Sequence, residues 1–340
     1  MKSIQINSFG LAQLSMQDIP VPQPGNDEVL VKVTAASLNY IDLDVIRGNY
    51  DPHLPLPHIP VSDAAGIVEA VGNNVSQWKK GDRVTTHYLR EWISGRRTEA
   101  MFHKRQGLEF PGVLAEYIVL PAAGIMRAPV NLSDEEAATL PIAGLTAWAG
   151  LVEAGEAKPG QTVLIQGTGG VSIFAMQIAN YLGMKTIALT GAESKAQKLK
   201  ALGADEVINY KTHPEWPKEV LRLTNGRGVD ASLNIAGGGT VSQSVQALAI
   251  GGFIGLVGYL DNPAIPLDFF SMLQRNARIA GITVGSLESY AHFVTFIEKT
   301  GLKPVIDSVF PFHKAADALQ YLESGQHFGK VVISFRDIQS

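Results

Sequence analysis

The stretch Val163-Leu-Ile-Gln-Gly167-Thr-Gly169-Gly170-Val171-Ser172 decides the fold of this 340-residue chain. An apolar strand runs into closely spaced glycines and then directly into an amphipathic helix, predicted over residues 171–182. Glycine lets the backbone turn tightly and approach a pyrophosphate, which meets the N–H groups at the helix start. Ser172 stands where the G-x-G-x-x-G pattern has its third glycine, and a second strand follows about 20 residues on. We expect a dinucleotide site, because a plain strand–helix turn does not explain three glycines in four positions.

Strands and helices alternate on both sides of this turn. The N-cap Ser133 opens the region, a second helix is predicted over 194–202, and the predicted strands are 162–166, 186–190, 206–208, 231–234, 253–257 and 279–283. This rhythm is typical of βαβ units and a parallel sheet. The predicted fold class is therefore α/β, with a Rossmann doubly wound parallel sheet over residues 129–284.

A second, β-rich domain flanks this sheet in the sequence. Val29-Leu-Val-Lys-Val-Thr alternates with period two, as a half-buried strand does. After residue 285 we expect helices near 287–300 and 313–324 and a closing strand over 330–335. The sequence therefore predicts one domain from residues 1–128 and 285–340, with the sheet domain inserted between its two pieces.

Composition excludes several classes of protein. The chain has no cysteine, which excludes disulfides, thiolate nucleophiles and every Cys-containing zinc site. The net charge is −4 without a block of Lys or Arg, so we expect no nucleic-acid or anionic-membrane partner. The most apolar stretch, 245–260, is interrupted by four glycines and does not predict a membrane span. With no apolar signal segment visible, we expect a cytoplasmic protein.

The end of the second strand bears on the form of the nicotinamide cofactor. An NAD enzyme usually has Asp or Glu there to accept the ribose 2′-hydroxyl, whereas this chain has Thr190-Gly191. Ser194, Lys195 and Tyr210 are available for a 2′-phosphate, which favours NADP(H). Glu193 argues for NAD(H) unless it faces solvent, and Lys195 can also be an ordinary exposed helix lysine.

Several further motifs follow one another in a fixed order. They are Pro22-x-Pro24 with Glu28-Val-Leu-Val-Lys-Val, Ser37-Leu-Asn39-Tyr-Ile-Asp42, Ala64-Ala-Gly66-Ile-Val-Glu-Ala-Val-Gly72, Gly81-Asp-Arg-Val, Ala137-Ala-Thr-Leu-Pro141-Ile-Ala-Gly144-Leu-Thr146 and Leu202-Gly-Ala-Asp-Glu-Val-Ile-Asn-Tyr210. With the glycine turn, they make the chain resemble the medium-chain dehydrogenase/reductase superfamily over essentially its whole length. More narrowly, it is similar to the zinc-free quinone oxidoreductase and alcohol-dehydrogenase-like branches. The resemblance implies that the β-rich domain is a GroES-like catalytic domain.

The resemblance also locates the zinc ligands of zinc-dependent relatives. The matching positions here are Asn39 or its neighbours, Ser62-Asp63 and Ile142. Zinc needs about three thiolate, imidazole or carboxylate ligands, and Asp63 alone is insufficient. The segment 88–110 has arginines and lysines where relatives have the cysteines of a structural zinc. We expect no metal.

For the catalytic residues, the resemblance implies Asn39, Asp42 and Tyr50 at the substrate cleft. An Asn amide and a Tyr hydroxyl donate hydrogen bonds, which a metal-free site needs to stabilise charge on a substrate oxygen. The alternative is that residues 39–42 are a helix cap, since Asn and Asp are favoured there. For the cofactor, the implied residues are Thr146, Gly167, Thr168, Gly169, Gly170, Val171, Thr190, Gly191, Ser194, Lys195, Tyr210, Ala236, Val257, Gly258, Tyr259, Ile282, Thr283 and Val284.

These observations favour a zinc-independent, NADP(H)-dependent oxidoreductase that transfers hydride to quinones or α,β-unsaturated carbonyls. Two alternatives stay open: an alcohol or aldehyde dehydrogenase of the same superfamily, and a non-catalytic NADPH-binding protein. The partner is then a small carbonyl or quinone molecule. We also expect a homodimer, because the last strand of the sheet domain, near 278–283, is often a dimer edge in such proteins.

Overall fold

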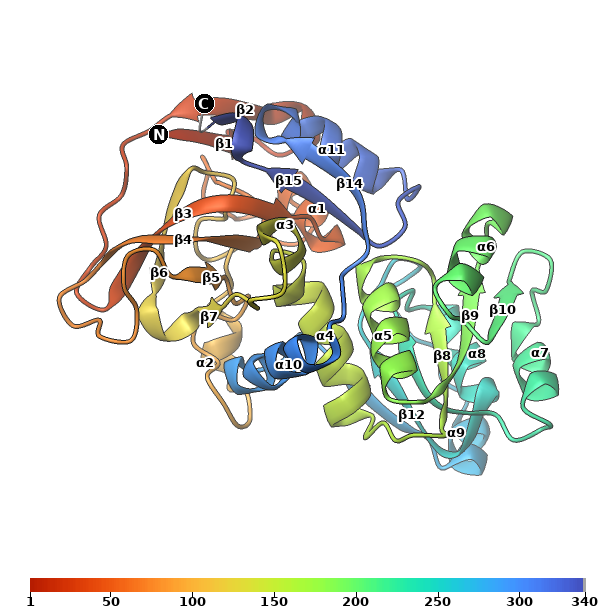
Figure 1. The fold of residues 1–340 in the computed structure, drawn as a ribbon. Helices are drawn as coiled ribbons and strands as arrows, with labels where there is room; N and C mark the ends of the chain where they lie inside the picture. The colour runs from red at the N-terminus through yellow and green to blue at the C-terminus, as the bar shows by residue number, and fades with distance from the viewer. Residues whose placement is uncertain (339–340) are drawn as a thin grey trace. The chain divides into compact units, whose positions relative to one another are not determined.

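The computed structural model describes residues 1–338, which divide into two compact units (Figure 1). One unit comprises Met1–Leu145 and the chain from Ser286 onward; the other comprises Thr146–Gly285. Residues 129–145, predicted to open the sheet domain, thus belong to the first unit, and residue 285 belongs to the second. Contacts explain the shift, because Arg83 pairs with Asp134 at 2.6 Å and the Ile142 N–H donates to Asp63 at 3.1 Å. Residues 339–340 of the predicted first domain lie outside the described residues.

The second unit is built on a six-stranded parallel sheet. In spatial order its strands are β10 (Glu206–Asn209), β9 (Lys185–Thr190), β8 (Thr162–Gln166), β11 (Val229–Asn234), β12 (Leu248–Leu256) and β13 (Arg278–Gly281). The order reverses between β8 and β11, as in a doubly wound dinucleotide-binding sheet. The predicted fold class is confirmed.

Helices cover this sheet, and its central strand β8 is buried at every position. The helical segments are α4 (Leu145–Trp148), which begins at the unit boundary, the π-helical turn η4 (Ala149–Ala154), α5 (Gly170–Tyr181), α6 (Glu193–Ala201), α7 (Trp216–Leu223), α8 (Gly239–Ala247) and α9 (Phe269–Arg275). Helix α8 packs against both α7 and α9. Leu164, Ile187, Val220, Val245 and Ile254 bury the seam between helices and sheet. Strands covered on both faces carry no polar alternation.

The first unit is β-rich. A hairpin-like pair, β1 (Lys2–Ile6) and β2 (Leu14–Asp18), accompanies a seven-stranded sheet. The sheet order is β14 (Ile306–Pro311), β15 (Lys330–Ser334), β3 (Glu28–Ser37), β4 (Asp63–Val71), β5 (Arg83–Thr85) and β7 (Met126–Arg127), and β6 (Tyr117–Pro121) also pairs with β3. In Figure 1 the C-terminal β15 runs beside the N-terminal β3, and Val332 lies opposite Ser37. This pairing brings the two ends of the chain together at residues 37–39.

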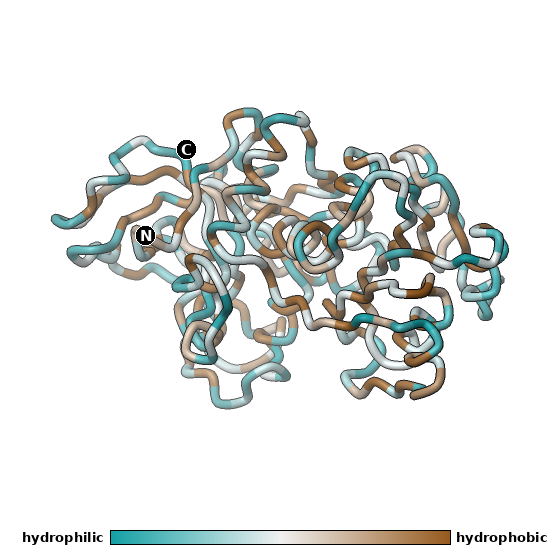
Figure 2. Tube along the Cα trace, turned by 90° about the horizontal axis from the view of Figure 1, so that it is seen from below, coloured by the Kyte–Doolittle hydropathy of each residue, from teal (hydrophilic) through white to brown (hydrophobic). Residues whose placement is uncertain are grey.

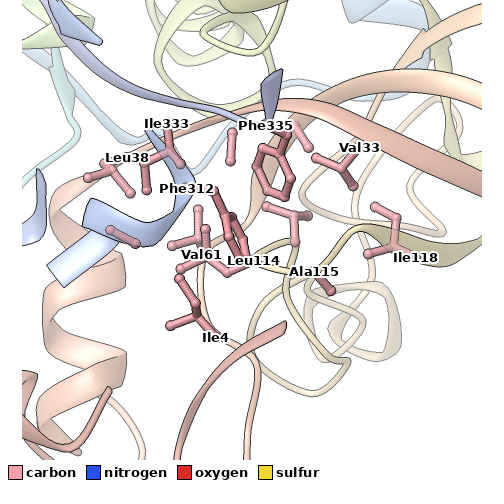
Figure 3. Packing of buried hydrophobic residues seen from close by; sticks show 14 of the residues in the cluster. Ile4, Val33, Leu38, Val61, Leu114, Ala115, Ile118, Phe312, Ile333 and Phe335 are labelled. Atoms are coloured by element: carbon pink, nitrogen blue, oxygen red, sulfur yellow. The ribbon is translucent and has the colours of Figure 1, made fainter. Parts of the chain in front are cut away.

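Helices and helical turns complete the first unit. They are α1 (Tyr40–Arg47), α2 (Glu99–Phe102), α3 (Asp134–Ala137), α10 (Leu287–Thr300) and α11 (Ala315–Glu323), with the helical turns η1 (Leu11–Gln13), η2 (Ala122–Gly124), η3 (Leu140–Gly144), η5 (Phe312–Lys314) and η6 (Arg336–Ile338). Figure 3 shows the core beneath them, where the Phe312 and Phe335 rings lie 4.7 Å apart between Val61, Leu114 and Ile333. Both chain ends contribute to this cluster, so the N- and C-terminal pieces form one body.

Hydrophobic residues alternate with hydrophilic ones along the trace, and hydrophilic residues gather at the outermost loops (Figure 2). Among residues 1–338, no helix is long and apolar enough to cross a membrane.

Candidate active site

The glycine turn has the geometry that a pyrophosphate site requires. Gly167 has φ 76°, a left-handed conformation that favours glycine, and Gly169 caps α5 in open space, because a Cβ on it would meet no atom within 4 Å. The N–H groups of the first turn of α5 have no acceptor within the helix. Ser172 replaces the third glycine; it is buried, and its hydroxyl donates to the Gln166 carbonyl at 2.6 Å. The serine thus fastens helix to strand where a glycine would only permit close approach.

Two strand ends converge next to this turn. The Tyr210 N–H donates to the Thr190 carbonyl at 3.0 Å. A Cβ on Gly191 would lie 2.5 Å from the Tyr210 hydroxyl and 3.1 Å from Cε of Lys211. Tyr210 and Lys211 therefore cover the backbone at the position where an NAD enzyme carries its acid. The first turn of α6 brings Ser194 and Lys195 to the same strand end.

Buried hydrogen bonds fix the remaining strand ends. Asn234 accepts from the Gly237 N–H at 2.8 Å and donates to Thr240 at 3.0 Å. Gly258 approaches the Ile235 carbonyl so closely that a Cβ would lie 2.0 Å from its oxygen. Thr146 Oγ1 donates to the Thr283 carbonyl at 3.1 Å, which joins two of the predicted cofactor residues.

All predicted cofactor residues lie in the second unit, and apart from Thr146 they follow the carboxyl ends of its strands or begin the next helix. The chain thus gathers them at the edge where open α/β sheets bind ligands. A cavity of about 220 Å³ opens at the same edge, and its lining residues are Gln166, Leu189, Tyr210, Pro214, Trp216, Thr240 and Gln243. The Trp216 ring N–H donates to the side-chain oxygen of Gln243 at 3.0 Å and fixes that amide. The apolar walls of the cavity and this fixed amide suit a flat heteroaromatic group such as adenine.

In the first unit, the predicted residues Asn39 and Asp42 form the start of α1. Asn39 is the N-cap, and its N–H donates to Asp42 Oδ2 at 2.7 Å. The Asn39 side chain also bonds to residues far away in sequence. Its oxygen accepts from Lys330 Nζ at 2.7 Å, and its nitrogen donates to Asp63 Oδ2 at 2.8 Å. Residues 39–42 thus begin a helix, as the capping alternative has it, and the Asn39 amide serves a second network as well.

This network is a buried charge cluster. Lys330 Nζ also donates to the Leu38 carbonyl at 2.5 Å, and the Ile142 N–H donates to Asp63 Oδ2 at 3.1 Å. Asp63, Asp42 and Lys330 are 0%, 2% and 3% exposed, so water does not screen their charges. Asp63 Oδ1 is buried and has no hydrogen-bond partner among the described residues.

Burial moves the titration of all three charged groups toward their neutral forms. It raises the pKa of Asp42, against the Asn39 N–H; the Asp63 charge adds to the rise, while Lys330 and the Ser62 N–H oppose it. It raises the pKa of Asp63 to about 6, against Lys330, Asn39 and Ile142. It lowers the pKa of Lys330, against the two carboxylates. A single interior cation therefore balances two carboxylates whose negative charge is weakened.

Tyr50, the third predicted catalytic residue, lies outside this network. Its hydroxyl oxygen accepts from Arg105 Nη1 at 2.9 Å, and Arg105 is held by Glu109 through bonds at 3.0 and 3.1 Å. Because Arg105 has only donors, the Tyr50 O–H must point elsewhere and is available to a substrate oxygen. The structure therefore joins Asn39 to Asp42 directly and holds Tyr50 separately.

The residues at the zinc-ligand positions do not fit a zinc ion. Asn39 and Asp63 bond to each other, Ile142 contributes only its backbone N–H, and the Lys330 ammonium donates to Asn39. A divalent cation would meet one carboxylate and the repulsion of that ammonium. Among residues 1–338, no three His, Asp or Glu side chains are grouped so as to hold a metal ion.

Sequence reasoning missed Lys330, Arg105 and Lys211. Lys330 had a signal, because it is a lone charge at the head of the apolar strand Lys330-Val-Val-Ile. Such a charge is seldom fully buried unless it is paired. Arg105 and Lys211 had none, since each is one of several basic residues in a polar segment.

Comparison with protein families gives two separate matches. Residues 25–130 match the family described as alcohol dehydrogenase GroES-like domain, and residues 170–299 match the family described as zinc-binding dehydrogenase. The words "zinc-binding" describe the family as a whole. In this chain the zinc-ligand positions hold Asn39, Asp63 and Ile142.

Individual proteins match along their whole length. A zinc-type alcohol dehydrogenase-like protein of Schizosaccharomyces pombe is 41% identical, over 95% of this chain and 96% of that protein. A quinone oxidoreductase of Pongo abelii is 29% identical, over 98% and 97%. A solved structure of an NAD-dependent alcohol dehydrogenase is 38% identical with a TM-score of 0.88, over 98% and 99%.

Proposed function

This chain belongs to the medium-chain dehydrogenase/reductase superfamily of NAD(P)-dependent oxidoreductases, and we propose that it is a zinc-independent, NADP(H)-dependent reductase of quinones or α,β-unsaturated carbonyls. The observation that carries the proposal is how the residues at the zinc-ligand positions bond to one another. Asp63 Oδ2, the Asn39 amide, the Ile142 N–H and Lys330 bond to one another. Only Asp63 Oδ1 is left among the described residues at these positions, and one carboxylate oxygen is not a zinc ligand set. A small-molecule substrate follows from the family, whereas its chemical class is part of the proposal.

The absence of a metal ligand set favours conjugated acceptors. A zinc ion polarises a simple carbonyl as a Lewis acid, and hydrogen bonds must replace it in this site. In a quinone or enone, conjugation activates the carbon that accepts hydride, so the oxygen needs only a donor such as the Tyr50 O–H. A bound nicotinamide would supply the hydride, and the proton that completes the reduction would come from solvent.

NADP(H) is supported by the residues at the end of β9. No carboxylate follows Thr190 directly, Tyr210 and Lys211 lie against Gly191, and Lys195 lies in the first turn of α6. A carboxylate about 4 Å from a 2′-phosphate would cost about 1 kcal/mol in water and several when partly desolvated. The Glu193 side chain is exposed at the start of α6 and so leaves room for the phosphate. NAD(H) stays the alternative, since one similar structure is described as NAD-dependent.

An alcohol dehydrogenase is the second candidate, because two of the similar proteins are described as alcohol dehydrogenases or like them. Steady-state assays separate the two. We expect NADPH oxidation with benzoquinone-type and enone acceptors, and little NADP reduction with primary or secondary alcohols. Alcohol-dependent NADP reduction as the faster reaction would favour the second candidate. Tight NADPH binding without turnover in either assay would contradict both.

We also propose a homodimer formed through the β13 edge. This strand ends the sheet, and along its outer side no strand of residues 1–338 pairs with it. Next to it in sequence, α9 exposes Phe269, Phe270 and Leu273 at 70%, 67% and 65%. Apolar side chains beside an open strand edge fit a second copy of the same surface, related by a twofold axis. A cytoplasmic location stays a prediction.

A further inference from the structure

The buried lysine Lys330 has no role in the sequence motifs, yet it touches the residue at the first zinc-ligand position. Its ammonium has three hydrogens and no acceptor. Two hydrogens bind the Leu38 carbonyl at 2.5 Å and Asn39 Oδ1 at 2.7 Å. Both acceptors lie directly before α1, while Lys330 begins β15, almost 300 residues away in sequence.

The lysine also determines how the Asn39 amide is oriented. If that amide were reversed, its NH₂ group would face the ammonium and its oxygen would face Asp63 Oδ2. Two donors and two acceptors would then oppose each other in a buried site. The observed orientation is the only one that satisfies both neighbours, so Lys330 fixes the N–H that Asn39 gives to Asp63 at 2.8 Å.

Asp63 Oδ2 also accepts from the Ile142 N–H at 3.1 Å, and this bond links Asp63 to the third zinc-ligand position. The segments that carry residues 39, 63 and 142 are thus joined by one cation, one amide and one carboxylate. A zinc ion in a metal-dependent relative joins the same three positions. Asp42 secures the same helix start through the Asn39 N–H at 2.7 Å.

We propose that the Lys330 ammonium is the resident cation of this site: with Asn39 and Asp63 it replaces the metal in joining three segments, and it positions α1 and the Tyr50 that follows it. Lys330 is a positioning residue and need not touch substrate. The inference rests on the proposed function only for its effect on turnover; its effect on α1 is independent of the substrate.

Removing the charge pair while keeping its shape tests the proposal. Lys330→Met alone leaves Asp63 buried without a counter-charge and can prevent folding. The double variant Lys330→Met/Asp63→Asn removes both charges and retains an acceptor for Asn39 and Ile142. Lys303→Met is the control, since that lysine of the same unit is exposed and binds the Asn131 carbonyl and Glu136.

Two readouts decide the outcome. In the double variant we expect the amides of residues 40–47 to exchange with deuterium at least about tenfold faster than in the wild type, because the α1 start is released. We expect kcat to fall at least about tenfold with KM for NADPH within about twofold, because positioning acts on the reacting geometry. The control should change neither. Unchanged exchange in α1 overturns the proposal, and so does an unchanged kcat.

Chemical rescue separates charge from packing. Lys330→Ala lacks the atoms of n-propylamine and, like Lys330→Met, leaves Asp63 without a counter-charge, so the variant is produced and kept with propylammonium present. Removing propylammonium should lower kcat and α1 protection and adding it back should restore them, while 1-propanol should not. Equal rescue by both compounds would show a packing role and overturn the proposal. If the wild type turns over no quinone or enone, the proposed function fails, and the exchange of α1 still decides the role of Lys330.

Discussion

At the scale of single residues, Asn39 serves two structures at once. Its backbone begins α1, and its amide links Lys330 to Asp63. An Asn before a helix predicts the first role, because Asn is a favoured N-cap. The second role depends on residues 63 and 330, whose proximity is set by strand pairing and not by local sequence. The assignment of Asn39, Asp42 and Tyr50 as catalytic residues stays a prediction.

Val61 holds a strained backbone conformation two residues before Asp63. Its φ is 73°, a left-handed value that is unusual for a β-branched residue, and its side chain is buried in the core. At an extended position, replacing Val by Ala lowers the free energy of unfolding less than replacing it by Gly. At a left-handed position we expect the reverse, with Val61→Gly about 1 kcal/mol more stable than Val61→Ala.

Chemical denaturation of both variants checks this expectation. Val33 is the matched control, since it is equally buried and lies within strand β3. There Val33→Ala should be the more stable of the pair. The same order at both positions would show that Val61 carries no left-handed strain.

The cofactor preference is also decided at single residues. We expect Lys195→Ala and Lys211→Ala each to weaken 2′,5′-ADP binding about tenfold and to leave 5′-AMP binding unchanged, because the two probes differ only in the 2′-phosphate. Lys185, at the opposite end of β9, is the control for loss of a lysine. Calorimetric titration measures all of these. NADH binding at least as tight as NADPH, or a preference unaffected by Lys195→Ala, would refute the phosphate assignment.

At the scale of elements, strand β4 begins with the buried Asp63. We expect this carboxyl group to give the free energy of unfolding an unusual pH dependence. The Asp63 pKa is raised from 3.8 to about 6, so the folded protein binds this proton more tightly than the unfolded chain. The contribution is present in full below about pH 4 and is lost as pH rises to about 6. Relative to Asp63→Asn, the wild type should lose on the order of 3 kcal/mol across that window. Unfolding curves measured at several pH values give this difference, and parallel pH profiles of the two proteins would contradict it.

The open edge of the parallel sheet leads to a prediction about assembly. In the wild type we expect a sedimenting mass near twice the chain mass of 36.5 kDa. Phe270→Ser/Leu273→Ser should shift it to the monomer, since it removes apolar area that only a partner covers. Val130→Ser, at another exposed apolar residue, should have no effect. A wild-type monomer at micromolar concentration would remove the proposed dimer.

Periodicity predicted the elements best where local signals were strong. The strand Thr162–Gln166 and the helix Leu287–Thr300 occur as expected, and helices α5 and α6 differ from expectation by one residue at each end. The helices α7 to α9 were not predicted, although Pro217 lies in the first turn of α7, where proline is compatible with a helix. The two compact units divide after Leu145 instead of near residue 129, and the N-cap Ser133 could not indicate this, because it marks a helix and not the unit on which that helix packs.

At the scale of the molecule, the predicted cofactor residues and the buried charge cluster lie in different units. The second unit gathers the predicted cofactor residues at one sheet edge, and the first unit contains the cluster of Asn39, Asp42, Asp63 and Lys330. The sequence predicted the grouping of the cofactor residues, because strand ends and glycines are local features. It identified only part of the charge cluster in the first unit, because that cluster depends on β15 lying beside β3.

Hydride transfer to a conjugated acceptor without a metal underlies the proposed function, and isotope tracing on metal-free enzyme decides whether it occurs. Enzyme dialysed against a chelator, with its zinc content known from elemental analysis, is supplied with NADPH deuterated at the transferred C4 position and an α,β-unsaturated ketone. We predict undiminished turnover of zinc-free enzyme and deuterium at the β-carbon of a saturated ketone. Deuterium at the carbonyl carbon of an alcohol, or activity that is lost with zinc and returns when zinc is added, would contradict metal-free reduction of a conjugated acceptor.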